Sequence, residues 1–203
     1  MRQKIKPDVI VLATGGILAT PDISGIDLHH VLKSSDLHKK IKSWQRFLGP
    51  NALRRLTHLW MPIGKRVIII GGAMQGCELA EFLTLRGRKV IIVEQAEHIG
   101  EGLGSEKMFR LFKWMKIRGV KMVPAVKEYK AITEEGLKII DWQGKENVIY
   151  ADTIITVTPF ISDTDLLKRI EGKVSEVYCI GDCREPGLIA YAIADGAKVA
   201  RKI

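Results

Sequence analysis

The middle of the chain alternates between two hydrophobic patterns, short apolar runs and longer amphipathic segments. The apolar runs suit buried strands, whereas the segments between them carry apolar residues at helical spacing and stop at Gly87 and Gly119. Strands separated by helices of this length imply right-handed βαβ crossovers and a parallel sheet. The pattern predicts strands at residues 67–70, 89–93 and 120–123 and helices at residues 74–86 and 105–118.

Residues 125–150 show a different pattern, three short extended pieces around the turns "EEG" and "QGKEN". This pattern predicts a three-stranded antiparallel flap inserted into the wound domain. The parallel sheet is expected to resume at "ADTIITV", and "PDVIVL" and "VSEVYCIGD" are read as further buried strands, with an Ala-rich helix after Pro186. The predicted fold class is α/β, a Rossmann-like domain with a parallel sheet and this flap.

The stretch "GGAMQG" lies between the first predicted strand and its helix. In a dinucleotide-binding G-x-G-x-x-G loop, the first glycine makes the tight turn, the second admits the pyrophosphate and the third lets helix and strand pack closely. Gly71 and Gly76 take the first and third places, and Ala73 takes the second, where its methyl group narrows the phosphate approach. The candidate phosphate-binding residues are Gly71, Gly72, Ala73, Met74, Gln75 and Gly76.

Glu94 stands at the end of the second predicted strand, 23 positions after Gly71, and Gln95 follows it. A carboxylate at this place accepts the ribose hydroxyls of an adenosine and repels a 2′-phosphate, which favours NAD(H) over NADP(H). Arg86 and Arg88 are near in sequence and keep NADP(H) open as an alternative. An α/β turn that binds no ligand is the other alternative.

Charge and composition narrow the class of protein. The chain has 203 residues and a net charge of +9, and residues 33–66 hold nine basic residues against Asp36 alone. The bases follow no nucleic-acid recognition motif, so nucleic acid is not an expected partner. No apolar run could span a bilayer and no secretory signal opens the chain, so we expect a cytoplasmic protein. Cys77, Cys179 and Cys183 are expected to be buried, unreactive thiols.

Short motifs flank the glycine loop in a recognisable order: "ATG" at Ala13, Thr14 and Gly15 before it, and "GD" at Gly181 and Asp182 after it. With "GGAMQGCELA", Glu94 and the closing "AIADGAKVARKI", they make the chain resemble the C-terminal half of the 2,4-dienoyl-CoA reductase, trimethylamine dehydrogenase and NADH:flavin oxidoreductase family. The similarity covers residues 7–203 apart from the basic region.

The resemblance implies an NAD(H)-binding domain, residues 66–160, inserted into a partial FAD-binding domain made of residues 1–32 and 161–203, with residues 33–65 as a basic helical insert. It implies that Asp182 hydrogen-bonds the flavin ribitol and that the "ATG" residues lie against the same dinucleotide. Such an enzyme passes hydride from NADH through FAD to a barrel that holds FMN and a 4Fe-4S cluster and reduces an enoate or enoyl substrate.

The sequence also departs from the family pattern. These residues include neither the first flavin-binding βαβ unit nor the barrel, and residues 156–159, Thr-Val-Thr-Pro, replace the usual A-x-G-x-x-P loop. We therefore expect a portion of a larger reductase, inactive alone, that binds NADH weakly and purifies without FAD. The rival hypothesis is a nucleotide-binding regulatory or interaction module without catalysis.

The basic insert has three interpretations, because apolar residues recur opposite its lysines and arginines. It docks on the barrel or another subunit, which includes a second copy of the chain; it packs on its own domain; or it attaches to an anionic membrane surface, the least favoured of the three. No side chain is predicted to be catalytic or to bind metal, because none of the five histidines has a carboxylate partner at useful sequence spacing. The apolar residues concerned are Trp44, Phe47, Leu53, Leu56 and Trp60.

Overall fold

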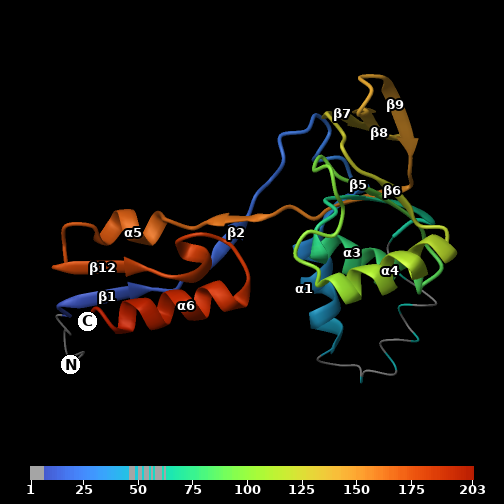
Figure 1. Cartoon of the computed structure of the whole chain (residues 1–203). Coiled ribbons are helices and arrows are strands. Elements are labelled where there is room, and N and C mark those ends of the chain that lie inside the picture. Colours follow the sequence, from blue (N-terminus) through green and yellow to red (C-terminus); the bar gives the residue numbers. More distant parts are fainter. Residues whose placement is uncertain are drawn as a thin grey trace. The chain divides into compact units, whose positions relative to one another are not determined.

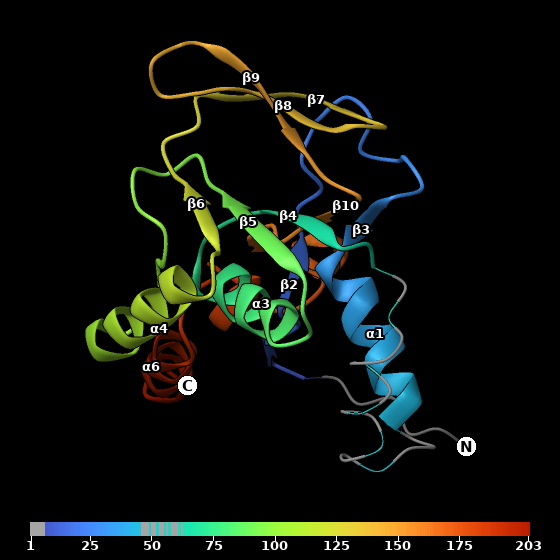
Figure 2. The ribbon, with the colours of Figure 1, turned by 90° about the vertical axis from the view of Figure 1, so that its right-hand side faces the viewer.

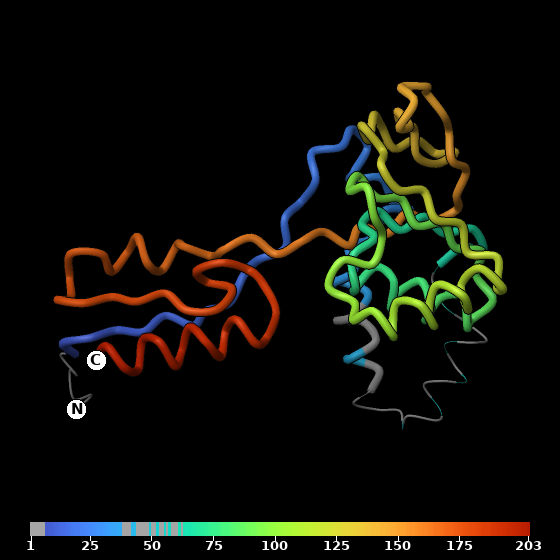
Figure 3. Tube along the Cα trace, viewed as in Figure 1, coloured from blue at the N-terminus to red at the C-terminus, as the bar shows by residue number. Residues whose placement is uncertain are grey.

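The computed structural model describes residues 7–45, 49, 52, 55, 57, 61 and 63–203. The chain divides into two compact units: unit 1 comprises Met1–Thr20 and Thr158–Ile203, and unit 2 comprises Pro21–Val157. The chain therefore leaves unit 1 once and returns to it once, as the colour sequence along the trace shows (Figures 1 and 3). In the described part of the chain, no helix has the length and apolar character that crossing a membrane requires.

Unit 2 is built on a five-stranded sheet in which every neighbouring pair is parallel. The predicted parallel sheet is thus confirmed, and each predicted strand lies within a residue or two of its expected position. Its order is β3 (Val31–Lys33), β10 (Thr153–Thr156), β4 (Arg66–Ile70), β5 (Lys89–Val93) and β6 (Lys121–Val123).

Helices cover one face of this sheet (Figure 2). Because side chains alternate along a strand, Val67 and Ile69 of β4 point to the same face, where they pack with Cys77 and Leu83 in a shared hydrophobic core. The helices are α1 (Ser34–Gln45), α3 (Met74–Thr84) and α4 (Ser105–Ile117). The predicted helices of the wound domain are confirmed in α3 and α4.

The opposite face of the sheet carries the predicted antiparallel flap (Figure 2). Ile68 and Ile70 of β4 pack there with Leu137 and Ile139 in a second hydrophobic core. The flap consists of β7 (Glu128–Thr133), β8 (Gly136–Ile140) and β9 (Glu146–Tyr150), paired in that order. Strand β4 is therefore buried on both faces, as expected for the central strand of a parallel sheet.

The described part of unit 1 contains two small sheets. Strands β1 (Val9–Leu12) and β12 (Glu176–Cys179) pair in parallel, and β2 (Gly16–Leu18) pairs antiparallel with β11 (Phe160–Ser162). The helical elements are α5 (Asp165–Ile170), the 3-10 turn η1 (Gly181–Cys183) and α6 (Ile189–Ala200). The sequence pattern predicted β1, β12 and α6 but missed β2, β11 and α5, because three-residue strands and a six-residue helix are too short to establish a period.

Unit 2 begins earlier than the predicted boundary at residue 32. Ile154 of β10 pairs with Val31 of β3, and the Ile154 amide donates a hydrogen bond to the His30 carbonyl at 3.0 Å. These bonds attach residues 30–33 to the parallel sheet, whereas the sequence assigned residues 1–32 to the flavin-binding segment.

The basic insert is described only in part. Leu37 of α1 is buried with Met61 and Ile63 in the core that α3 shares, so this part of the insert packs on its own unit. Most of residues 46–60, and the side chains of Trp44, Phe47, Leu53, Leu56 and Trp60, lie outside the described residues.

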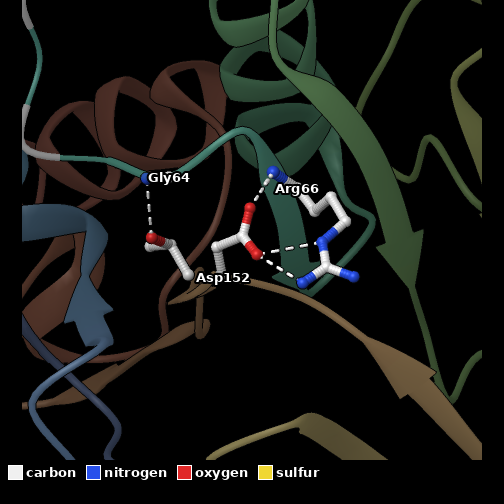
Figure 4. Close-up of polar contacts among 4 residues, drawn as sticks. Gly64, Arg66 and Asp152 are labelled. Carbon is white, nitrogen blue, oxygen red and sulfur yellow. Dashed lines mark hydrogen bonds and ion pairs between the residues drawn. The ribbon is translucent and has the colours of Figure 1, made fainter.

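An ion pair joins the starts of β4 and β10 (Figure 4). The Asp152 carboxylate accepts hydrogen bonds from the Arg66 backbone amide at 2.8 Å and from Arg66 Nε at 2.9 Å. The Gly64 amide donates to Thr153 Oγ1 at 3.0 Å, beside the ion pair. Hydrogen bonds from the Arg66 side chain and backbone hold the pKa of Asp152 below its ordinary value.

We expect Asp152→Asn to lower the free energy of unfolding by about 1 kcal/mol, because a partly exposed charged pair contributes modestly. Since the folded-state pKa of Asp152 is lowered, its contribution is present above pH ~4 and is lost as pH falls toward the folded pKa. Urea unfolding measured between pH 7 and pH 3 should show a smaller acid-induced loss in the variant than in the parent. The exposed Asp22→Asn should leave the unfolding curves unchanged, and an equal loss in both variants would contradict the assignment.

Candidate dinucleotide-binding site

The glycine loop connects β4 to α3 at the carboxyl end of the sheet, where ligands of wound sheets bind. Gly71 has a φ of +111°, and a Cβ there would lie 2.1 Å from the Val157 carbonyl oxygen. A Cβ on Gly76 would lie 1.9 Å from the Gly71 carbonyl oxygen. Only glycine therefore fits the first and third places of the predicted loop.

Ala73 occupies the second place of the loop and is the N-cap residue of α3. Its φ of −66° is ordinary for any residue, and the residue is exposed, so a methyl group at this position does not strain the fold. The Met74 amide donates to the Glu101 carbonyl at 2.8 Å, which closes one side of the loop. Phosphate would draw on the first-turn amides and the helix dipole.

Glu94 follows β5 and lies directly beside the glycine loop. Its Oε2 accepts a hydrogen bond from the Gly72 amide at 2.5 Å, and its Oε1 accepts one from the Ala96 amide at 2.9 Å. Each oxygen keeps a further lone pair for a hydroxyl group. The structure thus brings the predicted loop and acid together, with exposed Gln95 next to them.

Arg86 and Arg88 lie at the other end of β5, between α3 and the strand's first residue. Arg86 Nε donates to Thr57 Oγ1 at 3.0 Å, and its guanidinium lies 3.5 Å from the centre of the Phe82 ring. Arg88 donates to the Arg86 carbonyl at 3.0 Å. These contacts hold both arginines at the amino end of β5, whereas Glu94 follows its carboxyl end. The structure therefore does not support the argument for NADP(H) that rested on the nearness of these arginines in the sequence.

Two groups near Glu94, buried Cys77 and half-buried Tyr129, remain neutral near pH 7. Burial, with the charges of Glu78 and Glu94, raises the pKa of the Cys77 thiol to about 11, and Sγ donates to the Gly72 carbonyl at 3.3 Å. Burial is also the main cause that raises the pKa of Tyr129, whose hydroxyl donates to the Val93 carbonyl at 3.3 Å. Cys77 therefore has a packing role, as predicted, and supplies no nucleophile.

A pocket of about 450 Å³ in unit 1 brings the flanking motifs together. Ala13 and Gly15 of "ATG" line it with Gly181 and Asp182 of "GD", and exposed Thr14 lies between the first two in sequence. The remaining walls are mainly apolar side chains of α6 and the residues before it, among them Leu188, Ile189 and Ile193.

Asp195 positions this pocket, and the sequence pattern gave no reason to single it out. It is 8% exposed, its Oδ2 accepts a hydrogen bond from the Gly181 amide at 3.1 Å, and its Oδ1 pairs with Arg184 at 3.0 Å. Asp182 itself accepts the Gly187 amide at 3.1 Å. Only its burial in the folded structure indicates this role, because acids are rarely buried without partners.

The residues that replace the A-x-G-x-x-P loop carry the chain back into unit 1. The Val157 amide donates to the Ile70 carbonyl at 2.8 Å, so the loop begins as an extension of the sheet. Thr158 Oγ1 donates to the Ala19 carbonyl at 2.5 Å, and the Ala19 amide donates to the Pro159 carbonyl at 3.1 Å. Residues 157–159 thus serve as a connection in this structure.

One histidine has a carboxylate neighbour that lies far from it in the sequence. His30 Nδ1 lies 3.8 Å from Glu134 Oε2, so this histidine has a carboxylate neighbour. Sequence spacing could not show it, because the two residues are far apart in the chain and meet only when the flap folds over the sheet.

The comparisons with known proteins bear on both sites. Residues 1–196 match the family model described as pyridine nucleotide-disulphide oxidoreductase. The chain is 29% identical over 202 residues to cinnamate reductase of Clostridium sporogenes, covering 97% of this chain and 26% of that protein. It is 26% identical over 203 residues to an NADH oxidase of Thermoanaerobacter brockii, covering 98% of this chain and 28% of that protein.

Among solved structures, a 2-naphthoyl-CoA reductase in complex with 2-naphthoyl-CoA matches with a TM-score of 0.74 and 28% identity. The match covers 97% of this chain and 27% of that chain. The predicted family resemblance and fold class are thereby confirmed. The chain spans about a quarter of the length of these relatives.

We expect Gly76→Ala to destabilise unit 2 by about 2 kcal/mol or more, because its Cβ would lie 1.9 Å from the Gly71 carbonyl oxygen and backbone must move. Thermal unfolding followed by circular dichroism measures the effect. Gly104→Ala is the matched control, since a Cβ there meets nothing within 4 Å and φ is −64°. Equal melting temperatures for the two variants would contradict the close packing of α3 on β4.

Proposed function

The chain belongs to the pyridine nucleotide-disulphide oxidoreductase family, and we propose that it is the dinucleotide-binding portion of a larger NADH-dependent flavin oxidoreductase. Unit 2 binds NADH at the Gly71–Gly76 loop, and unit 1 contributes part of an FAD site. The bound cofactors supply the redox chemistry, hydride leaving NADH and being accepted by FAD.

The observation that carries this proposal is the hydrogen bond between the Gly72 amide and Glu94. It places the acid at the loop where the pyrophosphate would lie against the start of α3. The adenosine ribose then reaches the carboxylate, whose remaining lone pairs accept the ribose hydroxyls. A 2′-phosphate at the same place would meet a like charge, which favours NADH over NADPH.

The pocket of unit 1 supports the assignment of FAD. A carboxylate and three glycines share the pocket with apolar walls, a combination that suits a ligand with both hydroxyl groups and an aromatic ring system. Asp182 would accept a hydrogen bond from a ribitol hydroxyl, while the buried Asp195 holds the preceding turn in place. Gly15 and Gly181 both have positive φ, so the backbone lines the pocket closely at these points.

Exposed apolar side chains of unit 1 support a larger assembly. Ile189 is 81% exposed, Ile193 67% and Tyr191 62%, although all three belong to one helix. Ile189 and Ile193 also line the pocket proposed for FAD, whereas Tyr191, two residues from each of them, lies on another side of the helix and marks a surface that another part of the protein would cover. We assign that role to the rest of the reductase, with its flavin- and iron–sulfur-containing barrel.

The substrate class is an unsaturated acid or thioester. The relatives named cinnamate reductase and 2-naphthoyl-CoA reductase support an enoate or enoyl substrate, because both names describe a conjugated acid or its CoA thioester. The barrel, rather than the residues of this chain, would contact that substrate.

We expect calorimetric titration of the chain to give at least tenfold tighter binding of NADH than of NADPH. Glu94→Gln removes the charge and keeps the shape, so it should weaken NADH binding by about tenfold and narrow the preference. Glu97→Gln, at an exposed glutamate three residues on, is the control and should change neither value. Tighter binding of NADPH, or equal effects of the two substitutions, would refute the role of Glu94.

We also expect the 203-residue chain to purify without stoichiometric FAD. Its one glycine fingerprint lies in unit 2, so the flavin pyrophosphate has no glycine loop of its own among these residues. The visible flavin absorbance of the purified protein measures this. A yellow preparation with one FAD per chain would show that the pocket of unit 1 suffices for binding.

A further inference from the structure

Three side chains with metal-binding atoms gather at one end of the flap in unit 2: His29, His30 and Glu134. Their ligand atoms all lie within 4.8 Å of one another. Both histidines belong to the turns that precede β3, and Glu134 belongs to the turn between β7 and β8. The glycine loop and the pocket of unit 1 include none of the three residues.

The backbone around this cluster is held from both sides. Ser24 forms a parallel bridge with Ala131 of β7, and the Ile132 amide donates to the Ser24 carbonyl at 2.7 Å. The His30 carbonyl accepts the Ile154 amide at 3.0 Å, which fixes the turn against β10. Figure 2 shows the segment before β3 running beside β7. The cluster therefore joins two segments whose places are already set.

His30 is the residue that points to a ligand. Its side chain is only 8% exposed, yet Nδ1 and Nε2 are both buried without a hydrogen-bond partner. A buried polar atom without a hydrogen-bond partner lowers the stability of the fold by about 1–3 kcal/mol, so unpaired buried ring nitrogens are rare in folded proteins and call for an explanation. The nearest carboxylate oxygen, on Glu134, lies 3.8 Å from Nδ1, which is too long for a hydrogen bond.

The same separation suits two ligands of one metal ion. Zinc binds imidazole nitrogen and carboxylate oxygen at about 2.0–2.2 Å, which puts neighbouring ligands of a tetrahedral ion roughly 3.4 Å apart. Small rotations of the side chains of His29 and Glu134, both exposed, bring the cluster to that spacing. The rings of His29 and His30 already lie edge to face, with centroids 5.2 Å apart.

We propose that His29, His30 and Glu134 bind a divalent transition-metal ion of the zinc type. Two imidazoles and one carboxylate form a borderline ligand set that suits zinc better than magnesium or calcium, which prefer oxygen alone. Water completes the coordination, since Glu134 is 67% exposed. The ion links the turn between β7 and β8 to the segment before β3. Because it binds the folded state, it raises the free energy of unfolding of unit 2 by an amount that depends on its affinity and its concentration.

The test is titration of the 203-residue chain with zinc, followed by calorimetry and by the melting temperature. We expect one equivalent to bind, to raise the melting temperature, and to be removed by a chelator. His29→Ala and Glu134→Gln should each weaken zinc binding at least tenfold and abolish the thermal shift. These residues are exposed, so the variants keep the fold even where His30→Ala, at a buried position, does not.

His98→Ala and Glu135→Gln are the matched controls, because both residues are exposed and lie outside the cluster. They should bind zinc as the parent does. Absence of binding, or binding unaffected by His29→Ala and Glu134→Gln, would overturn the proposal. Binding lost only in the double variant Cys179→Ser, Cys183→Ser would assign the zinc to those thiols instead. NADH affinity should be the same in parent and Glu134→Gln, which separates this site from the dinucleotide site.

Discussion

The close contact between Gly76 and the carbonyl of Gly71 sets how helix α3 leaves strand β4, and most of unit 2 depends on it. A side chain at either position would collide with backbone, at 1.9 Å from the Gly71 oxygen or 2.1 Å from the Val157 oxygen. Because glycine at position 76 lets α3 pack closely against β4, Cys77, Ala80 and Leu83 of the helix reach the hydrophobic core on that face of the sheet. The same packing sets the start of α3 at the carboxyl end of the sheet, where the pyrophosphate of the proposed cofactor would bind.

Glu94 connects this loop geometry with the cofactor preference that we propose. Its carboxylate accepts hydrogen bonds from the amides of Gly72 and Ala96 and so holds the loop in place, while two groups near it, buried Cys77 and half-buried Tyr129, carry no charge near pH 7. The negative charge at the ribose position is therefore not offset by those two neighbours. Ala73 is exposed and has an ordinary φ, so its methyl group leaves the fold unchanged.

The two units differ in how completely they bury their apolar residues. In unit 2 the central strand β4 is covered by helices on one face and by the flap on the other. In unit 1 a helix with a buried acid, Asp195, exposes Ile189, Tyr191 and Ile193. The chain spans about a quarter of the length of the relatives that it matches, and the exposed apolar side chains of unit 1 support the larger protein proposed above.

Local pattern in the sequence was enough for the strands β4, β5 and β10, the helices α3 and α4, the flap, and the pairing of a glycine loop with Glu94. Each of these depends on periodicity or on a spacing within one βαβ unit, and both are local properties. Strand β3 could not be predicted in this way, because three residues show no period and only its bonds to β10 make it a strand. The neighbourhood of His30 and Glu134, the support of Gly181 by Asp195, and the position of Arg86 away from Glu94 were likewise decided by tertiary structure. In each case the partners come from separate elements, and only the packing of the sheet, flap and helices determines which of them meet.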